Sequence, residues 1–258
     1  MEEVAAHNSE EGHTWFKAIN RFSDMAPHEI KRYLGAGHHG DNANVTLAPY
    51  PQKKGVQQYG SYVDWRGYMN PIRDQMQCGS CYSFAAVATT EGRYAVKYGA
   101  RVYLSEQQIL DCARDCYGCN GGFSDRALIF LKMNGAMSQA SYPYYNQQTA
   151  CNNNPAYVVA RVAEVYNILN PQLAIMDGPM AVYVQAQGAF MQYGGGIFNG
   201  VCGQYDHAVT AVGFGNEGGI EYWIIRNSWG PSWGEAGHIR IRANGNCLIT
   251  FNSAPLIA

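Results

Sequence analysis

The segment Gln75-Met76-Gln77-Cys78-Gly79-Ser80-Cys81-Tyr82 opens a stretch with a helical pattern. After it, apolar and small residues recur at roughly helical spacing as far as Tyr98, and Gly99 can end such a helix. A helix that begins near Ser80 puts Cys81 at its N-terminus, where the partial positive charge stabilises thiolate over thiol. A lone cysteine is more often a buried structural thiol, but this position predicts a reactive sulfur.

Two later segments, Asp206-His207-Ala208 and Asn227-Ser228-Trp229-Gly230, supply an imidazole and an amide. A thiol, an imidazole and an amide are the groups of a cysteine nucleophile, its base and the residue that orients the base. His207 is one of two histidines after residue 57, and the other, His238, has the pattern of a residue on a strand face. We therefore expect Cys81, His207 and Asn227 to meet in the folded chain.

The cysteine spacing also permits two other interpretations. Cys78-x2-Cys81 and Cys116-x2-Cys119 resemble a zinc ribbon, but the pairs lie further apart than is usual, and zinc would leave the imidazole and amide segments without a role. The Cys78–Cys81 segment could also be a thioredoxin-like redox pair, but it does not follow a clear strand of a βαβ unit.

Composition excludes several classes of partner. The 258 residues include 18 Lys and Arg against 20 Asp and Glu, a net charge of −2, which argues against nucleic acid and anionic membranes. No apolar run reaches the roughly 18 residues of a membrane span, and the first residues lack the apolar core of a signal peptide. Eight cysteines favour disulfides in an oxidising compartment, and Asn44-Val45-Thr46 is a candidate glycosylation site.

A change of composition near residue 57 divides the chain into residues 1–57 and 58–258. The first part is polar and helix-permissive to residue 34, then rich in glycine and proline like a linker. The second part is predicted as a helical half followed by a sheet half, an α+β fold with a site in the cleft between them. Helices are expected at 80–98, 105–110, 124–134 and 171–177, and strands at 157–162, 180–184, 208–214, 220–226 and 238–241.

These segments resemble the papain family of cysteine peptidases, and in particular its cathepsin L-like proenzymes. Upstream, Ala18-Ile19-Asn20-Arg21-Phe22-Ser23-Asp24 resembles the propeptide motif Gly-x-Asn-x-Phe-x-Asp, with Ala18 in place of glycine. The resemblance covers nearly the whole chain and extends to five further segments: Val63-Asp64-Trp65-Arg66, Leu104-Ser105-Glu106-Gln107, Cys119-Asn120-Gly121-Gly122, Tyr142-Pro143-Tyr144 and Gly194-Gly195-Gly196-Ile197. It implies a papain-like fold with a helical left half, an antiparallel β-barrel-like right half and the active-site cleft between them.

The resemblance implies roles at matched positions. Cys81 is the nucleophile, His207 the base and acid, Asn227 the residue that orients His207, and Gln75 forms the oxyanion hole with the N–H of Cys81. Since two aromatic residues at S2 positions are bulky, we expect a shallow, apolar S2 pocket that prefers small or medium apolar P2 residues. The implied S2 residues are Phe123, Ser124, Tyr183, Tyr205, Ala208 and Phe251, and the other implied substrate-binding residues are Gly79, Gly121, Gly122 and Trp229.

The resemblance also implies a zymogen. Residues 1–57 would be a truncated inhibitory propeptide, residues 58–258 the mature peptidase domain, and residues 35–57 would run through the cleft in reverse. Cleavage between about Gly55 and Ser61 would release activity. The implied disulfides are Cys78–Cys119, Cys112–Cys151 and Cys202–Cys247, which leave Cys116 without a partner, and Tyr82 replaces the tryptophan that usually follows the nucleophile.

The expected function is therefore a cysteine endopeptidase that acts through an acyl-enzyme, without metal or organic cofactor. The alternatives are a non-catalytic papain-like binding protein and, less favoured, a CxxC disulfide oxidoreductase. The implied partners are polypeptide substrates, the chain's own propeptide and cystatin-type inhibitors. The resemblance also implies that the protein is a monomer. The implied location is the secretory pathway, leading to a lysosome or vacuole or to secretion.

Overall fold

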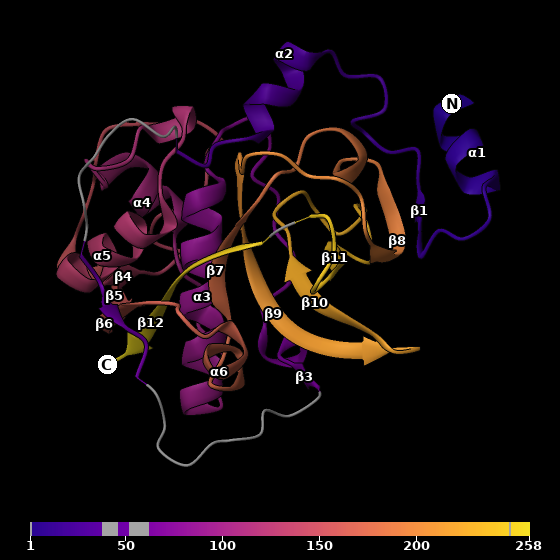
Figure 1. Ribbon diagram of the computed structural model, residues 1–258. Helices are drawn as coiled ribbons and strands as arrows, with labels where there is room; N and C mark the ends of the chain where they lie inside the picture. The colour runs from indigo at the N-terminus through magenta and orange to yellow at the C-terminus, as the bar shows by residue number, and fades with distance from the viewer. Residues whose placement is uncertain (1, 38–45, 52–61, 248) are drawn as a thin grey trace.

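The structure is a computed structural model that describes residues 2–37, 46–51, 62–247 and 249–258. Helices α4 and α5 lie to one side of a long mixed sheet, with α3 between them and the strands, whereas α1 lies at the opposite flank and α2 above (Figure 1). The helices are α1 (Glu2–Ser9), α2 (Pro27–Ile30), α3 (Cys81–Tyr98), α4 (Glu106–Cys112), α5 (Ser124–Asn134) and α6 (Pro171–Met176). Within this described part, no helix is long and apolar enough to cross a membrane.

Helix α3 is the central element because nearly all of its first four turns are buried. It contacts strand β9 on one side and α5 on the other, so it joins the two halves. Gly99 ends the helix with φ +67°, a left-handed conformation that costs glycine little. The predicted helix at 80–98 is thus confirmed, and so are the helices at 105–110, 124–134 and 171–177, to within two residues at each end.

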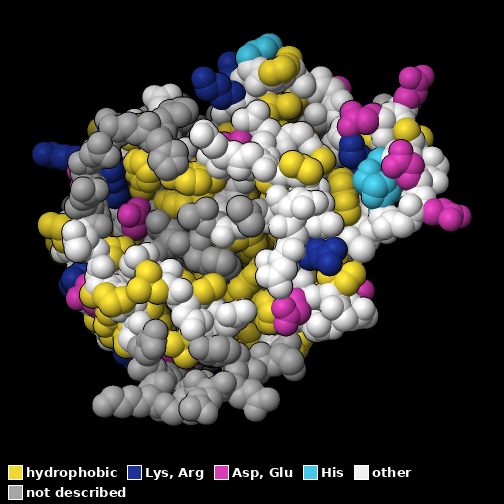
Figure 2. Space-filling view, in the orientation of Figure 1, with side chains coloured by type: hydrophobic (Ala, Val, Ile, Leu, Met, Phe, Trp, Pro, Cys, Tyr) yellow, Lys and Arg dark blue, Asp and Glu magenta, His cyan; other side chains and the backbone are white. Residues whose placement is uncertain are grey.

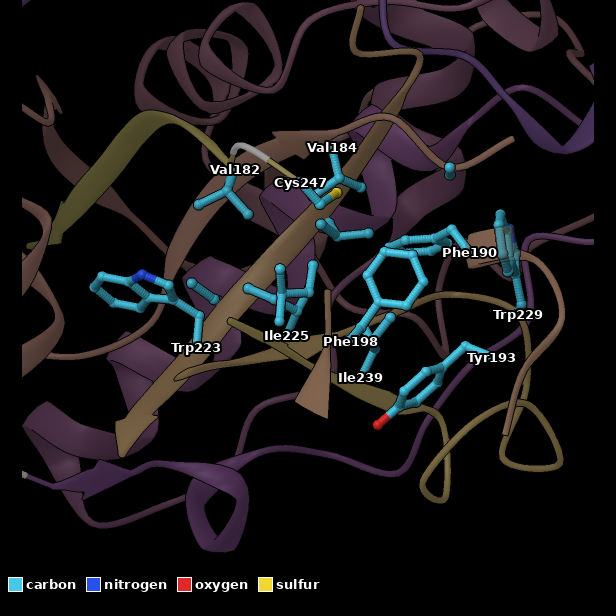
Figure 3. Close-up of a cluster of buried hydrophobic side chains, with 14 of the residues drawn as sticks. Val182, Val184, Phe190, Tyr193, Phe198, Trp223, Ile225, Trp229, Ile239 and Cys247 are labelled. Atoms are coloured by element: carbon cyan, nitrogen blue, oxygen red, sulfur yellow. The ribbon is translucent and has the colours of Figure 1, made fainter. Parts of the chain in front are cut away.

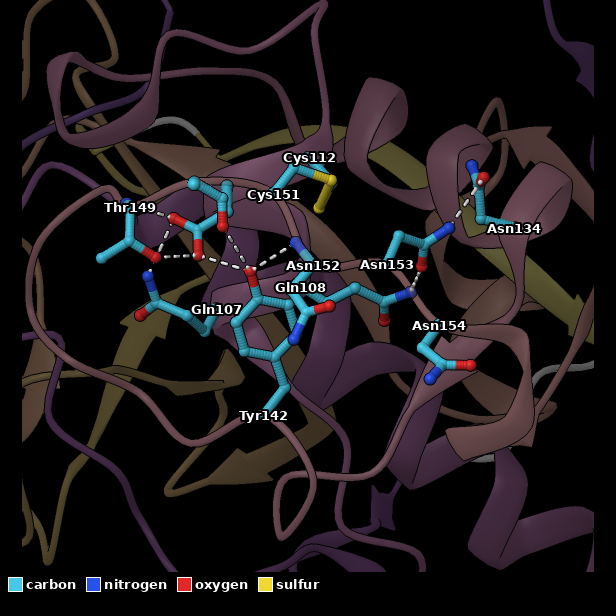
Figure 4. Close-up of a disulfide and its surroundings, with 12 residues drawn as sticks. Gln107, Gln108, Cys112, Asn134, Tyr142, Thr149, Cys151, Asn152, Asn153 and Asn154 are labelled. Atoms are coloured by element: carbon cyan, nitrogen blue, oxygen red, sulfur yellow. Dashed lines mark hydrogen bonds between the residues drawn. A yellow bond between two sulfur atoms is a disulfide. The ribbon is translucent and has the colours of Figure 1, made fainter.

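The loop that follows the helical half is fixed by a disulfide and a polar network (Figure 4). Cys112 at the end of α4 is bonded to Cys151, and nearby Asp111 accepts hydrogen bonds from Tyr142 Oη at 2.8 Å and from Thr149 N at 2.6 Å. The Tyr142 hydroxyl accepts from Asn152 N at 3.1 Å. A covalent bond and these hydrogen bonds therefore hold the loop against α4.

Ten of the described strands form one long sheet in the order β1-β8-β11-β10-β9-β7-β12-β6-β2, with β3 beside β9, and β4 and β5 form a separate two-stranded sheet. Most neighbours are antiparallel, but β11 with β8 and β2 with β6 are parallel. The described strands follow an open path, so the expected antiparallel β-barrel-like half is in fact a mixed sheet that does not close. The strands are β1 (Trp15–Lys17), β2 (Ala48–Pro49), β3 (Val63–Asp64), β4 (Ala136–Met137), β5 (Val158–Ala160), β6 (Val162–Asn167), β7 (Met180–Val184), β8 (Tyr193–Phe198), β9 (His207–Glu217), β10 (Ile220–Arg226), β11 (His238–Arg242) and β12 (Thr250–Ile257).

The sheet half has an aromatic and branched core that reaches the candidate site (Figure 3). Trp229 belongs to this core, is fully buried, and lies beside Phe190 with ring centroids 5.9 Å apart. Trp223, Phe198 and Tyr193 extend the same cluster along the strands. Trp229, which follows Asn227 and Ser228 in the chain, is therefore held in place by the core of the sheet half.

The N-terminal segment, defined here as residues 2–37, runs from the right flank, where α1 and β1 lie beside β8, across the top of the molecule at α2 in the view of Figure 1. Its strand β1 extends the sheet by pairing antiparallel with β8, and Trp15, Phe22 and Tyr33 enter the core of the sheet half. Basic and histidine side chains lie over α2, whereas acidic side chains gather over α1 (Figure 2). The sequence predicts helix-permissive structure here but gives no sign of β1.

Candidate active site

Cys81 is the first residue of α3 and is fully buried. Its Sγ accepts a hydrogen bond from the N–H of Ala208 at 3.4 Å. Burial raises the pKa of the Cys81 thiol to about 12, and the backbone N–H groups of Ala208, Gly35 and Tyr82 only partly oppose this rise. Burial outweighs these N–H groups and therefore favours the protonated sulfur at neutral pH.

His207, the first residue of β9, is fully buried next to the contact between Ala208 and Cys81. Its Nε2 lies 2.8 Å from Asn227 Oδ1, which also accepts the N–H of Ser228 at 2.8 Å. An oxygen that accepts from a backbone N–H can accept from Nε2 as well, so the proton of the neutral ring is on Nε2. Nδ1 has no hydrogen-bond partner among the described residues and keeps a free lone pair.

The environment of His207 favours its neutral form. Burial lowers the pKa of His207 to about 4, and the hydrogen bond with Asn227 opposes this shift. The indole of Trp229 stacks on the imidazole, with ring centroids 4.6 Å apart and planes at 25°. Trp229 thus covers one face of the ring and shields its bond to Asn227 from water.

Gln75, six residues before Cys81, is also fully buried. Its Oε1 accepts a hydrogen bond from Ser228 Oγ at 2.6 Å, which fixes the amide with Nε2 as the donor. Nε2 donates to the carbonyl of Cys78 at 2.9 Å and to the carbonyl of Tyr33 at 3.0 Å. The expected oxyanion-hole donor thus holds a carbonyl oxygen of the N-terminal segment.

The N-terminal segment crosses between the two rims of the cleft at residues 33–37. The N–H groups of Gly35 and Ala36 donate to the carbonyl of Asp206 at 3.1 and 3.0 Å, on the sheet half. Gly122 of the helical half donates to the Gly35 carbonyl at 2.9 Å and accepts from Gly37 N at 2.9 Å, and Ala36 pairs parallel with Gly122. The crossing chain therefore makes backbone bonds to both halves.

This crossing requires glycine on both sides. A Cβ on Gly35 would lie 2.0 Å from the carbonyl oxygen of Gly79, and one on Gly79 would lie 2.8 Å from the carbonyl oxygen of Leu34. Leu34 is followed by Gly35, Ala36 and Gly37, so the backbone can lie flat in the cleft over these three residues. The prediction that residues 35–57 run through the cleft is met by 35–37 but is wrong for residues 48–49, which pair with β6 instead.

The expected S2 residues form an aromatic wall. Tyr183 on β7 is buried, its hydroxyl accepts from Ser124 N at 2.8 Å, and its ring stacks on Tyr205 at 5.1 Å. Ala208 is also buried, and a Cβ on Gly37 would lie 2.2 Å from the ring of Phe123. Gly121 turns the chain with φ +113° beside this wall. The side chain of Phe251 lies outside the described part of the structure, as do Asn44 and the expected cleavage region from Gly55 to Ser61.

The cysteines are arranged as the resemblance implies. Disulfides join Cys78 to Cys119, Cys112 to Cys151 and Cys202 to Cys247. Cys81 and Cys116 are free and buried. Because Cys78 is bonded to Cys119, the four cysteines of the zinc interpretation cannot share a metal, and Cys78 and Cys81 are not a redox pair. No metal-binding group of three or more His, Cys, Asp or Glu occurs among the residues that the structure describes.

The sequence analysis overlooked several residues around the cleft. Arg21 forms a bidentate ion pair with Asp74, the residue before Gln75, and the Tyr33 carbonyl is bound by Gln75 itself. Ser228 belongs to the Asn227 segment, and its hydroxyl fixes the Gln75 amide, a role that its sequence position does not indicate. Arg21 lies within the propeptide motif and Asp74 directly before Gln75, so their opposite charges were a signal, but the sequence gives no sign that the two residues are paired.

Comparison with known proteins identifies the chain. The sequence pattern described as "Papain family cysteine protease" matches residues 59–256. The chain belongs to this family. It is accordingly a papain-like cysteine peptidase, a hydrolase, and this membership gives no support to a non-catalytic binding protein or a disulfide oxidoreductase as its function.

Relatives and solved structures agree over most of the chain. Papaya proteinase 4 of Carica papaya is 40% identical over 247 residues, which cover 90% of this chain and 70% of that protein. Digestive procathepsin L2 from the larval midgut of Tenebrio molitor superposes with a TM-score of 0.90 at 29% identity, covering 98% of this chain and 89% of the other. The bromelain protease of Ananas comosus in complex with the E64 inhibitor gives 0.72 at 40% identity, covering 76% and 98%. The papain-like fold is thereby confirmed, and a proenzyme is among the neighbours.

Proposed function

We propose that this protein is a cysteine endopeptidase, made as a zymogen, in which Cys81 attacks the peptide carbonyl and His207 transfers the protons. One observation carries the proposal. The bond between His207 Nε2 and Asn227 Oδ1 leaves Nδ1 free, immediately before the Ala208 N–H that contacts Cys81 Sγ. A base with an oriented lone pair next to a thiol at a helix N-terminus is the arrangement that nucleophilic thiol catalysis needs.

The reaction begins when the cleft opens and water and substrate replace the N-terminal segment. The Cys81 proton then moves to His207 Nδ1, and the thiolate attacks the carbonyl carbon of the substrate. The oxyanion accepts hydrogen bonds from Gln75 Nε2 and from the N–H of Cys81. His207 gives its proton to the leaving amine, and a thioester to Cys81 remains.

Water completes the cycle. His207 takes a proton from a water molecule, the hydroxide attacks the thioester, and Cys81 leaves as thiolate. Throughout, Asn227 keeps the ring in one tautomer and one direction, as the third group of a triad does. Trp229 keeps water from that bond by its stacking on the ring.

Residues 1–57 act as the inhibitory propeptide, and residues 58–258 are the mature domain. The Tyr33 carbonyl occupies the Gln75 donor, and Gly35 to Gly37 fill the backbone-binding positions of the cleft. This chain runs parallel to Gly122, opposite to the direction in which the family binds its substrates, so no susceptible carbonyl faces Cys81 productively. Cleavage between about Gly55 and Ser61 releases the domain.

The unprimed side of the cleft accepts small or medium apolar P2 residues. The rings of Tyr183 and Tyr205 stack on each other at the expected S2 pocket, which limits its depth. In the zymogen, glycine at position 37 lies against the ring of Phe123, where a Cβ would not fit. A P2 arginine finds no described carboxylate among the expected S2 residues. A peptide with P2 arginine that is cleaved faster than its P2 valine and leucine counterparts would contradict this assignment.

The further elements of the proposal follow from family membership. The protein acts on polypeptides as a monomer in an oxidising compartment of the secretory pathway, either a lysosome or vacuole or the outside of the cell. Cystatin-type proteins are candidate inhibitors of the open cleft. Size-exclusion chromatography with light scattering tests the monomer, and an inhibition assay with a cystatin tests the inhibitor.

The deciding experiment combines activity with labelling. Acid-activated wild type should cleave peptide substrates between about pH 4 and 7, and a peptidyl epoxide should label Cys81 stoichiometrically and abolish cleavage. The matched control is Cys81→Ala, which should neither cleave nor be labelled. Acid incubation should also shorten the wild type but not Cys81→Ala, and equal shortening would show that processing is not the protein's own work.

A further inference from the structure

The bidentate ion pair between Arg21 of the N-terminal segment and Asp74 of the mature domain marks a site that the proposed mechanism does not use. Arg21 Nη1 lies 2.5 Å from Asp74 Oδ2, and Nη2 lies 3.1 Å from Oδ1. Nη2 also donates to the Trp229 carbonyl at 2.7 Å. The guanidinium lies 5.2 Å from the ring centroid of Phe22 and 5.3 Å from that of Tyr33.

The position of this pair along the cleft follows from the path of the N-terminal segment. Tyr33 is at Gln75, and Gly37 is at Gly122 and Phe123, on the acyl side of the scissile bond. Arg21 precedes Tyr33 in the chain and contacts Asp74, the residue before Gln75, and Trp229, which covers His207. Asp74 is thus on the other side of Gln75 from Gly122, where the leaving group of a substrate must lie.

The Asp74 carboxylate is held ready for a ligand by the mature domain. Its Oδ1 accepts the N–H of Met76 at 2.9 Å, and the backbone of Asp74 pairs antiparallel with Trp229. The carboxylate and the Trp229 carbonyl therefore keep their relative positions without Arg21. When the N-terminal segment leaves, three acceptor oxygens that matched one guanidinium become accessible together.

We propose that Asp74 forms a primed-side subsite that selects substrates with arginine on the leaving-group side of the scissile bond. Arg21 occupies this subsite in the zymogen. A guanidinium satisfies both carboxylate oxygens and the Trp229 carbonyl at once, whereas an ammonium is a point donor, so arginine binds better than lysine and lysine better than a neutral residue. This inference rests on the proposed peptidase function and names a further substrate preference of the same site.

The test uses quenched fluorescent peptides that share one acyl side and carry arginine or citrulline at the first, second or third residue after the scissile bond. Citrulline keeps the shape of arginine and lacks its charge. For the acid-activated wild type, we expect the ratio of kcat/KM for arginine over citrulline to reach about three- to tenfold at one of these positions, the range between an exposed and a charge-assisted pair. This ratio should fall as salt is raised from 50 mM to 1 M, because salt screens an exposed charge.

Two variants isolate the carboxylate. Asp74→Asn keeps the size of the side chain and an acceptor for Met76 N, and the ratio should fall to about one. Glu221→Gln removes an exposed acid on β10 and should keep the wild-type ratio. Because each ratio is taken within one protein, a general loss of activity does not affect it, and if Asp74→Asn does not fold, the salt dependence of the wild type still decides.

The outcomes separate the two claims. Hydrolysis of the peptides with a ratio near one at all three positions, or a ratio that Asp74→Asn leaves unchanged, overturns the acidic subsite and leaves the peptidase standing. No hydrolysis of any peptide and no labelling of Cys81 by the epoxide overturns the proposed function and the subsite with it.

Discussion

Replacement of Phe22 by alanine should uncover Cys81 in the intact zymogen. Phe22 belongs to the N-terminal segment but is only 4% exposed, because its ring packs on Tyr33 at 5.0 Å and on Trp229 at 4.8 Å. Truncation of a buried phenylalanine costs about 3–5 kcal/mol. Since its aromatic partner Trp229 belongs to the mature domain, this cost falls mainly on the docking of the N-terminal segment.

The expected size of the effect follows from this cost. Taking about 3 kcal/mol, and a factor of ten for each 1.36 kcal/mol, the open fraction should rise about 150-fold. The assay is the rate at which a peptidyl epoxide labels Cys81 at neutral pH, read by mass spectrometry of the unprocessed chain. Peptide mapping separates Cys81 from the other free thiol, Cys116.

The matched control is Ile19→Ala, which shortens an apolar side chain of the same segment that is 60% exposed. Its labelling rate should stay within about threefold of wild type, as is usual for surface substitutions. If Phe22→Ala and Ile19→Ala label at the same rate, the aromatic contact with Trp229 does not hold the cleft closed, and the reasoning is refuted.

Three further results are expected. Gln75→Ala in the processed enzyme should lower kcat by about 10²–10³ with little change in KM, because the lost donor acts on the oxyanion; a rise in KM with kcat unchanged would contradict the assignment. NMR titration of Cys81→Ala should find His207 neutral down to about pH 4 in the zymogen, with a higher midpoint once the N-terminal segment is removed and burial is relieved; equal midpoints would mean that the segment is not the cause. Replacement of both Cys112 and Cys151 by alanine should lower the free energy of unfolding by about 4 kcal/mol, since the bond closes a loop with a sequence separation of 39, and denaturant titration would detect a smaller loss.

The titration of His207 also fixes a direction of pH dependence. Its ordinary pKa is 6.5 and its pKa in the closed form is about 4, so the closed form binds fewer protons than the open form between these values. The closed form is therefore most stable above pH 6.5 and loses stability as the pH falls toward 4. Acid thus favours the open form through this residue.

The elements that the sequence predicts well have strong local signals. Helix α3 has a long periodic pattern ended by Gly99, β7, β9 and β10 are largely apolar runs bounded by turns, and β11 alternates isoleucine with arginine. Strand β8 was missed because Gly194-Gly195-Gly196 has low β propensity, and its pairing with β1 joins segments far apart in sequence. Strand β12 was missed for a similar reason, since it contains Pro255 and weak strand formers. The expected strand at 157–162 is two strands, β5 and β6, with a break at Arg161.

The candidate site likewise has features that the sequence predicts and features that depend on distant parts of the chain. Its residue types and their order along the chain are local information, and these pointed to Cys81, His207 and Asn227. The protonated state of the buried sulfur is not local, because it depends on burial by residues from distant parts of the chain. The same is true of the bond from Gln75 to Tyr33, which joins residues 42 positions apart.

The burial of Cys81 has a consequence for the lifetime of the protein. Peroxide attacks thiolates, and the products beyond sulfenic acid do not return to thiol without dedicated repair. A fully buried sulfur with a pKa of about 12 offers neither access nor thiolate, so it resists this damage until the N-terminal segment departs. In storage, the same covering that delays proteolysis thus preserves the reduced sulfur on which later proteolysis depends.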